Sequence, residues 1–309
     1  MQTQSTNRIL MIRPVRFAFN KQTAESNAFQ DAELAVETKD VAQGEAQREF
    51  DEMVRQLQAM GVEVIVYEDT TQPHTPDSIF PNNWVSFHAS GTVVLYPMMA
   101  ENRRVERRTD IIDDFARSFH VSRIIDLTHF EQEGKFLEGT GSMVLDRMHR
   151  VAFAGISPRT HPDVLAEYSK QSGYRVVSFH TADASGEAVY LTNVMMCIAS
   201  TFAIVCLAAI VNPDERIMVR QELEGMGKRI FDISLEQMKH FAGNMLMVLA
   251  RDNQLVLVMS KQAHESLTPT QIDQIDDYAT LLPFDLSMIE LNGGGSARCM
   301  MAEVHLPLK

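Results

Sequence analysis

The sequence predicts an α/β protein in which a unit of strand, strand, helix and strand occurs five times around one axis. Three observations predict this fold: five similar stretches recur along the chain, each with a helical pattern of recognisable ends, and a further β-rich run follows each helix. The stretches are spaced by about 50 to 60 residues, and each opens with a small or polar residue before an apolar strand. They are NNWVSF, GSMVLD, TNVMMC, GNMLMV and RCMMAE, and their second residues are Asn83, Ser142, Asn193, Asn244 and Cys299.

A second apolar run follows the first four stretches after a short turn, as expected for hairpins. These runs are TVVLYP, RVAFAG, FAIVCLA and QLVLVMS. No such run follows Cys299, whereas RILMIRP near the N-terminus has the required pattern. The sequence therefore predicts that the N-terminal strand completes the last repeat.

The helical patterns carry residues that are typical of helix ends. In NPDERIMVRQELEGMG, Asn212 is expected as the N-cap, Pro213 lies in the first turn and Gly227 follows the end. Thr268 and Pro269 begin TPTQIDQIDDYATLL in the same manner. The other helical patterns are GEAQREFDEMVRQLQAMG, NRRVERRTDIIDDFARSF and SPRTHPDVLAEYSKQSG, and the third strands are VEVIVY, SRIIDL, YRVVSF, KRIFDI and LSMIE.

Each unit is too small to bury both faces of its sheet, so the five units are expected to pack together as one domain over residues 1–309. No convincing linker separates the units. The alternative is an ordinary two-domain α/β chain in which the similarity between segments is accidental.

Composition excludes several classes of function. A net charge of -13 and a pI near 5.2 argue against nucleic acid as a partner, because phosphate binding needs basic patches. The start of the chain lacks the apolar core of a signal peptide, and the longest apolar run, FAIVCLAAIV, is roughly half of a membrane span. The three cysteines show no metal spacing and suit a reducing compartment. We expect a cytoplasmic protein with no membrane partner, no cofactor and no metal; a homodimer remains open.

Arrangement around an axis would bring the starts of the first strands together. Asn83, Glu138, Leu191 and Cys299 lie at or beside such starts, so they are expected to line one central cavity. Cysteines 197 and 206 lie inside apolar strands and are expected in the core. Cys299 instead follows NGGGSAR, where glycines allow the backbone to approach a ligand closely.

Five segments together resemble the guanidino-group-modifying superfamily, the penteins, which share a five-bladed propeller of ββαβ repeats. They are TPDSIFPNNWVSFH, FLEGTGSMVLDR, AGISPRT, TNVMMC and LNGGGSARCMMAEVHLP, and they span nearly the whole chain. Within the superfamily the sequence is most similar to the citrulline utilisation hydrolases, which are related to arginine deiminases and dimethylarginine hydrolases. The resemblance implies a small amino-acid substrate with a ureido or guanidino group, such as citrulline or arginine.

The resemblance also implies roles for individual residues. Cys299 matches the nucleophile that attacks the planar carbon of the substrate and forms a covalent intermediate. Asp77 and Asn83 match the polar pair that holds the substrate nitrogens. Many relatives have a carboxylate at the position of Asn83, and an amide there favours neutral citrulline over arginine.

Further site positions follow from the same match. Glu138 resembles the family's site glutamate, which pairs with a histidine or with the substrate. Phe80 resembles the residue that packs on the substrate, and Arg159 resembles the arginine that binds the α-carboxylate. Asn82 is included as a substrate-binding position. Arg159 as a surface residue and Glu138 as a turn cap are the structural alternatives.

One position departs from the family pattern. A histidine is expected directly before TNVMM, where this chain has Leu191. That histidine protonates the departing amine and then activates water, and leucine can do neither. Three explanations are open: an engineered substitution, a degenerate homologue that only binds an amino acid, or another group that supplies the proton. His180 and His74 do not align with the family position. The function predicted is thus a C–N hydrolase, with a non-catalytic binding protein and an amidinotransferase as alternatives.

The segment at residues 19–43 is longer than a simple connection between a strand and a helix. We expect it to fold over the mouth of the cavity as a lid that excludes water. A partly helical surface excursion is the alternative.

Overall fold

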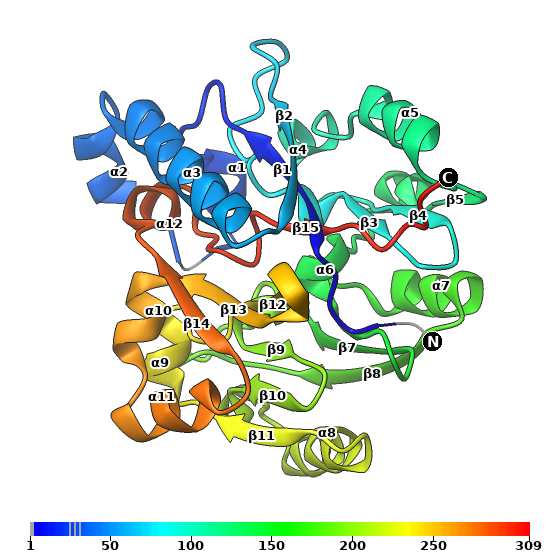
Figure 1. The fold of residues 1–309 in the computed structure, drawn as a ribbon, viewed down its shortest axis with the longest axis vertical. Helices are drawn as coiled ribbons and strands as arrows, with labels where there is room; N and C mark the ends of the chain where they lie inside the picture. Colours follow the sequence, from blue (N-terminus) through cyan, green and yellow to red (C-terminus); the bar gives the residue numbers. More distant parts are fainter. Residues whose placement is uncertain (1–2, 25, 28, 31) are drawn as a thin grey trace.

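The computed structural model describes residues 3–24, 26–27, 29–30 and 32–309 and has five three-stranded sheets (Figure 1). In every sheet the middle strand runs antiparallel to one neighbour and parallel to the other. The sheet orders are β15-β1-β2, β3-β4-β5, β6-β7-β8, β9-β10-β11 and β12-β13-β14. The strands are β1 (Arg8–Arg13), β2 (Glu63–Glu68), β3 (Val85–Phe87), β4 (Thr92–Leu95), β5 (Arg123–Asp126), β6 (Val144–Asp146), β7 (Val151–Ile156), β8 (Arg175–His180), β9 (Met196–Ile198), β10 (Phe202–Val205), β11 (Arg229–Asp232), β12 (Leu246–Leu249), β13 (Leu255–Ser260), β14 (Thr280–Phe284) and β15 (Ala302–Glu303).

The first strand joins the two ends of the chain in one sheet, as the sequence predicts. Strand β1 pairs antiparallel with β15, where Ile9 lies opposite Glu303 and Leu10 opposite Ala302. Its other edge pairs in parallel with β2. In Figure 1 the blue β1 lies between cyan β2 and red β15, and the other four sheets follow in chain order around the molecule.

Helices lie towards the periphery of the sheets (Figure 1). The predicted caps are confirmed at two of them: Asn212 Oδ1 accepts a hydrogen bond from the Asp214 amide, and Thr268 forms a capping box with Gln271. The α-helices are α1 (Lys21–Ala24), α2 (Ala32–Thr38), α3 (Ala42–Ala59), α4 (Glu101–Arg104), α5 (Thr109–Ser118), α6 (Gly139–Ser142), α7 (Pro162–Ser172), α8 (Pro213–Gly225), α9 (Leu235–Lys239), α10 (Lys261–Ser266), α11 (Pro269–Asp276) and α12 (Ser287–Gly293), and the 3₁₀ helices are η1 (Pro81–Asn83), η2 (Thr128–Glu133), η3 (Thr192–Val194), η4 (Leu207–Ala209) and η5 (Arg251–Asn253).

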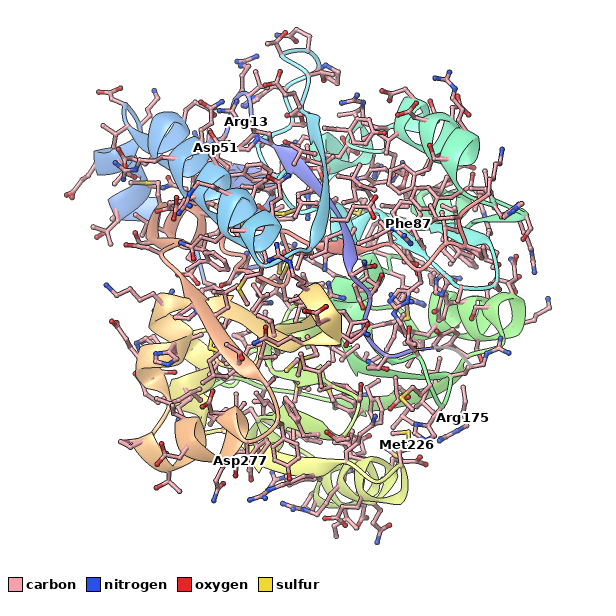
Figure 2. The ribbon with its side chains drawn as sticks, viewed as in Figure 1. Arg13, Asp51, Phe87, Arg175, Met226 and Asp277 are labelled. Atoms are coloured by element: carbon pink, nitrogen blue, oxygen red, sulfur yellow. The ribbon has the colours of Figure 1, made fainter. Side chains whose placement is uncertain are left out.

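Side chains attach these helices to the sheets (Figure 2). Arg13 of β1 donates from Nε and Nη2 to both carboxylate oxygens of Asp51 on α3, at 2.7 and 2.8 Å. Phe87 of β3 is buried and stacks on Phe115 of α5, with ring centres 4.8 Å apart. Burial of such rings removes apolar area from water and fixes each helix on its sheet.

The starts of several first strands are short turns rather than extended chain. Helix η1 precedes β3 and η3 precedes β9, and a one-turn helix, α6, precedes β6. In each 3₁₀ turn an amide bonds back three residues, from Trp84 to Pro81 and from Met195 to Thr192. The Thr192 hydroxyl also donates to the Ser142 carbonyl at 2.6 Å, which ties η3 to the preceding repeat.

Candidate active site

A small cavity of about 10 Å³ lies where these turns meet the segment that carries Cys299. That volume holds about one water molecule. Its wall is formed by the N-terminal segment, the turn at η1, helix α4, the chain before η3 and the glycine run. The lining residues are Thr23, Asn27, Asp77, Phe80, Asn83, Arg103, Arg159, Tyr190, Leu191, Gly293, Gly294, Gly295 and Cys299.

The thiol of Cys299 is held by two amide groups from other repeats. Asn193 Nδ2 donates to Cys299 Sγ at 3.4 Å, and Asn244 Nδ2 donates to the same atom at 3.3 Å. All three residues are buried. The second residues of the third, fourth and fifth repeats therefore converge, although about 50 residues separate each from the next. Donors aimed at the sulfur can stabilise negative charge as it attacks a substrate.

The glycine run allows neighbouring side chains to approach the backbone. Gly294 has a φ of +63°, and a Cβ atom there would lie 2.4 Å from Asn27 Nδ2. Cβ atoms at Gly293 and Gly295 would lie 2.7 and 2.9 Å from the ring of Phe80. In this structure, then, the close approach expected for a ligand is made by Asn27 and Phe80.

Asp77 has one oxygen without a partner. Its Oδ2 accepts from Asn20 Nδ2 at 2.7 Å and from the Thr23 hydroxyl at 3.2 Å, and lies 3.8 Å from Arg103 Nε. Its Oδ1 is buried and has no hydrogen-bond partner. Burial raises the pKa of Asp77, although Arg103 acts in the opposite direction.

Arg103 is central to the site and could not be recognised in the sequence. It donates to Asn83 Oδ1 at 3.0 Å and binds both carboxylate oxygens of Glu106. It also reaches the carbonyls of Asp77 and Phe80 at 3.4 Å. Burial raises the pKa of Glu106 to about 8 despite this partner. The run ENRRVERR contains four arginines, and only the fold distinguishes the buried one.

Glu138 lies behind the cavity wall rather than in it. Its Oε1 accepts from the Met99 amide at 3.1 Å, and its Oε2 accepts from Arg159 Nη1 at 3.3 Å and lies 3.8 Å from Arg103 Nη1. Arg159 itself lines the cavity, so its surface alternative is excluded. Its remaining donors bind the Ser26 hydroxyl and the Thr23 carbonyl.

Phe80, Asn83 and Leu191 also line the cavity, whereas Asn82 does not. The Asn82 side chain is fully buried, and neither of its amide atoms has a hydrogen-bond partner. Gly141 lies against Asn83 and Leu191, because a Cβ atom there would be 2.3 Å from Asn83 Nδ2 and 3.0 Å from Leu191 Cδ1. No described residue of the cavity wall is a histidine. The two histidines considered from sequence lie elsewhere: His180 contacts Glu215, and His74 contacts the Arg16 carbonyl.

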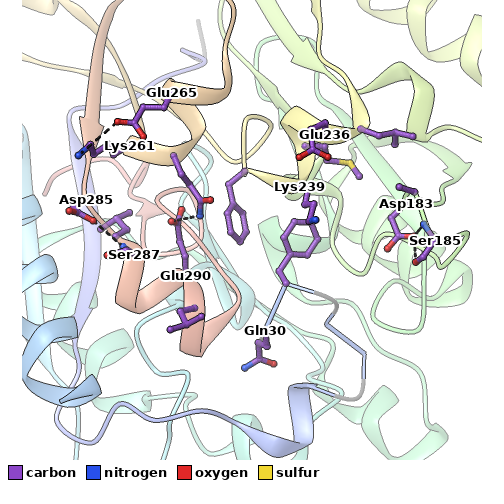
Figure 3. A pocket seen from close by; sticks show the side chains of 18 of the residues that line it. Gln30, Asp183, Ser185, Glu236, Lys239, Lys261, Glu265, Asp285, Ser287 and Glu290 are labelled. Atoms are coloured by element: carbon purple, nitrogen blue, oxygen red, sulfur yellow. Dashed lines mark hydrogen bonds and ion pairs between the residues drawn. The ribbon is translucent and has the colours of Figure 1, made fainter. Parts of the chain in front are cut away.

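An outer groove of about 970 Å³ lies on the other side of the N-terminal segment (Figure 3). Phe29 and Gln30 border it, together with α9, α10 and α12. The Phe29 ring centre lies 5.7 Å from that of Tyr190, which lines the inner cavity, and 4.9 Å from that of Phe241, which lines the groove. The segment containing Phe29 therefore separates the groove from the cavity.

Neither a metal-binding cluster nor a membrane-spanning helix is found in the part of the chain that the structure describes. No group of three or more His, Cys, Asp and Glu side chains there is placed to hold a metal ion. Within the same residues, no helix combines the length and apolar character needed to cross a bilayer.

Solved structures share this fold at low sequence identity. The N-terminal domain of ArgZ bound to product, an arginine dihydrolase from the ornithine–ammonia cycle in cyanobacteria, is 18% identical with a TM-score of 0.74, covering 96% of this chain and 97% of that one. AgrE in complex with ornithine and NAD⁺ is 18% identical with a TM-score of 0.73, covering 98% of this chain and 40% of that one. A variant of DDAH from Pseudomonas aeruginosa complexed with citrulline is 15% identical with a TM-score of 0.66, covering 97% and 99%.

Sequence comparison identifies the family. No curated protein matches the sequence significantly. The family model described as N,N dimethylarginine dimethylhydrolase, eukaryotic, matches residues 13–306. Since that match spans nearly the whole chain, the protein belongs to the N,N dimethylarginine dimethylhydrolase family of the pentein superfamily.

Proposed function

We propose that this protein is a cysteine-dependent C–N hydrolase that acts on the ureido or guanidino group of citrulline, arginine or a close derivative. The observation that carries the proposal is the Cys299 thiol, which lies in a cavity wall with the unpartnered Oδ1 of Asp77 and two buried arginines. Family membership supports the reaction class. One related structure, the ArgZ N-terminal domain, is described as covalently bound to a reaction intermediate.

The proposed reaction has two halves. The Cys299 sulfur attacks the planar carbon, an S–C bond forms, and the C–N bond breaks to release ammonia or an amine that takes up the thiol proton. Water then attacks the same carbon, and the S–C bond breaks to regenerate the thiol. Asn193 and Asn244 would stabilise charge on the sulfur at both stages.

Other side chains would hold the substrate. Asp77 and Asn83, which line the cavity, would bind the ureido or guanidino end of the substrate, and Phe80 would pack beside it. Arg159 would bind the α-carboxylate through its planar guanidinium, while Glu138 holds that guanidinium in place. We retain Asn82 only as a neighbour of this set, because its side chain lies outside the cavity wall.

Substrate entry requires the N-terminal segment to move. The cavity is far smaller than pockets that hold small molecules, which are about 300–1,000 Å³. Thr23 and Ser26 occupy the donors of Arg159 that a carboxylate would use. Within residues 19–43, positions 25, 28 and 31 lie outside the described residues, and those described around them cover the cavity. We therefore propose that this segment is a lid and that the outer groove leads to it.

The proposal extends to the whole molecule. It takes the five sheets as a closed five-bladed propeller forming a single domain over residues 1–309, supported by the pairing of β1 with β15. It places the protein in the cytoplasm, where three unpaired cysteines are stable. Formation of a homodimer is left to measurement of its mass in solution.

Leu191 favours one second candidate, a protein that binds the amino acid without turning it over. Its side chain occupies the cavity wall where the family has a general acid and base. The decisive experiment is the variant Leu191→His assayed with citrulline, arginine and methylarginines. Turnover of the true substrate is expected in this variant, with a gain over the unmodified protein of up to about 10⁴-fold.

Two variants control this experiment. Leu191→Asn introduces a polar side chain that does not gain or lose a proton near neutral pH, so it should not raise turnover. Cys299→Ala in the Leu191→His background should abolish it. A different result would support the binding protein instead. In that case a folded Leu191→His variant binds a substrate by calorimetry, but it forms no adduct on Cys299 and releases no product.

A further inference from the structure

The described residues of the cavity wall include no histidine, yet both halves of the reaction need a group that moves protons. We propose that Asp77 moves protons to and from the reacting nitrogen and water in this protein, in place of the missing imidazole. This inference rests on the proposed hydrolase function and adds a catalytic role to a residue expected only to bind substrate.

Geometry selects Asp77 among the titratable side chains of the wall. Asn20 and Thr23 fix its Oδ2 through two hydrogen bonds, which orients the carboxyl group. Its Oδ1 is buried without a partner, although a buried acceptor left unpaired is costly. Asp77 and Cys299 line the same cavity, so the unpaired carboxyl oxygen of Asp77 is available to accept a proton from the thiol and to contact the leaving nitrogen.

The other titratable groups of the described wall are already engaged. The Tyr190 hydroxyl donates to the Gly294 carbonyl, and burial raises its pKa far above the ordinary tyrosine value. Arg103 donates to Glu106 and Asn83, and Arg159 donates to Glu138 and the N-terminal segment. Guanidinium groups also keep their protons at any pH at which the protein is folded.

The surroundings of Asp77 set its acidity in a useful direction. Burial disfavours its charged form and raises its pKa, and this effect exceeds the opposing influence of Arg103, Asn20, Arg159 and Thr23. A carboxyl group with a raised pKa binds its proton more tightly than an exposed aspartate does. It can therefore accept a proton and return it to a leaving amine. Glu138, which also faces Arg103, lies behind the wall and cannot exchange a proton with the substrate directly.

The proton transfers balance in both halves. In the first, ionised Asp77 accepts the thiol proton as the S–C bond forms and passes it to the nitrogen as the C–N bond breaks. In the second, ionised Asp77 accepts a proton from the attacking water and returns it to the sulfur as the S–C bond breaks. No oxidant, reductant or second substrate is needed.

A double-mutant cycle tests this role. The unmodified protein, Asp77→Asn, Leu191→His and the double variant are compared by rapid-quench mass spectrometry of the Cys299 adduct, with saturating citrulline or arginine, and by calorimetric binding. In the unmodified background, Asp77→Asn should slow adduct formation by about 10² or more, with a smaller change in Kd. With histidine at position 191, the same substitution should cost about tenfold or less, because the imidazole takes over the transfers.

Each other result is decisive. Equal loss of rate from Asp77→Asn in both backgrounds would show that Asp77 only binds substrate, and the inference would be wrong while the hydrolase function stood. The hydrolase function would be overturned as well if neither the unmodified protein nor Leu191→His formed an adduct or turned over a substrate. If Asp77→Asn does not fold, the pH dependence of adduct formation decides. Leu191→His should shift the pH range over which the rate of adduct formation changes, relative to the unmodified protein. If the two proteins show the same pH range, the inference is contradicted.

Discussion

The Nη1 atom of Arg103 lies 3.0 Å from the Oδ1 atom of Asn83, and both side chains are buried. A guanidinium group can only donate hydrogen bonds, so this contact fixes the orientation of the Asn83 amide. The amide nitrogen is left with one long contact, 3.5 Å from the Glu138 carbonyl. Asn83 therefore presents a donor to any group that enters beside it, and a carbonyl oxygen is a better partner for it than an amidinium nitrogen.

The variant Asn83→Asp should change substrate preference. A carboxylate would still accept from Arg103, and its second oxygen would accept from the N–H groups of a guanidinium. We expect the ratio of kcat/KM for arginine over citrulline to rise by about tenfold, measured in the Leu191→His background. Asn212→Asp is the matched control, since both residues cap α8 well and the position is remote from the cavity wall. An unchanged ratio would contradict the proposed orientation.

The variant Ser26→Ala should loosen the lid. It removes the hydroxyl that accepts from Arg159 Nε and Nη2 at 3.1 and 2.8 Å. Amide hydrogen exchange in peptides covering residues 17–30 should become faster, and saturating citrulline should slow it in the unmodified protein. Ser185→Ala, on the far side of the groove, should leave this exchange unchanged. A lid role is excluded if ligand has no effect on these peptides.

The variant Asn193→Ala should slow attack by the thiol. It removes one of the two amide donors to the Cys299 sulfur while leaving that of Asn244. A hydrogen bond to a charged group is typically worth about 1.5–3 kcal/mol, so adduct formation in the Leu191→His background should fall by about tenfold or more. Asn212→Ala, which removes an exposed helix cap, controls for lost stability. If Asn193→Ala kept the full rate of adduct formation, the Asn193 amide would contact the Cys299 sulfur without stabilising its charge.

The variant Glu290→Gln should change the pH dependence of stability. Burial raises the pKa of Glu290 to about 7 from an ordinary value of 4.5, although Ser296 and Gln262 donate to it. The folded protein thus binds a proton that the unfolded chain releases above pH 4.5. This contribution to the free energy of unfolding is lost as pH rises from 4.5 to about 7, at about 1.4 kcal/mol for each pH unit.

Urea unfolding between pH 5 and pH 8 checks this expectation. Glu290→Gln should flatten the decline in the free energy of unfolding below pH 7. Glu265→Gln removes an exposed carboxylate that pairs with Lys261 in the same groove, and it should keep the original slope. Parallel curves for the unmodified protein and Glu290→Gln would show that the Glu290 carboxyl titrates normally.

Repetition made much of the fold predictable. Five related stretches and their helix caps were enough to predict the unit, and the absence of a second apolar run after Cys299 pointed to the N-terminal run. One third strand was predicted wrongly: LSMIE lies largely in α12, and the strand that pairs in parallel with β13 is β14, where the helical pattern was expected to continue. Equivalent positions in different repeats also predicted that Cys299 would meet the other strand starts. Its two amide donors are Asn193 and Asn244, both found by that spacing.

Contacts between unrelated segments were not predictable in this way. Arg103 lies in the short helix α4 within a run of arginines, and its burial depends on Glu106, Asn83 and two carbonyls that the fold assembles. The N-terminal segment has no periodic pattern that would place Thr23 and Asn27 in the wall. Asn82 precedes Asn83 directly, yet adjacent residues in a tight turn point in different directions, and only Asn83 reaches the cavity.

The pairing of β1 with β15 has a consequence for biosynthesis. The ribosome makes β1 before the other strands and β15 after them, so one edge of β1 stays open until β15 has been made. An open edge can pair with other chains and promote aggregation. Transient protection of this edge by a chaperone would therefore favour correct assembly of the newborn polypeptide.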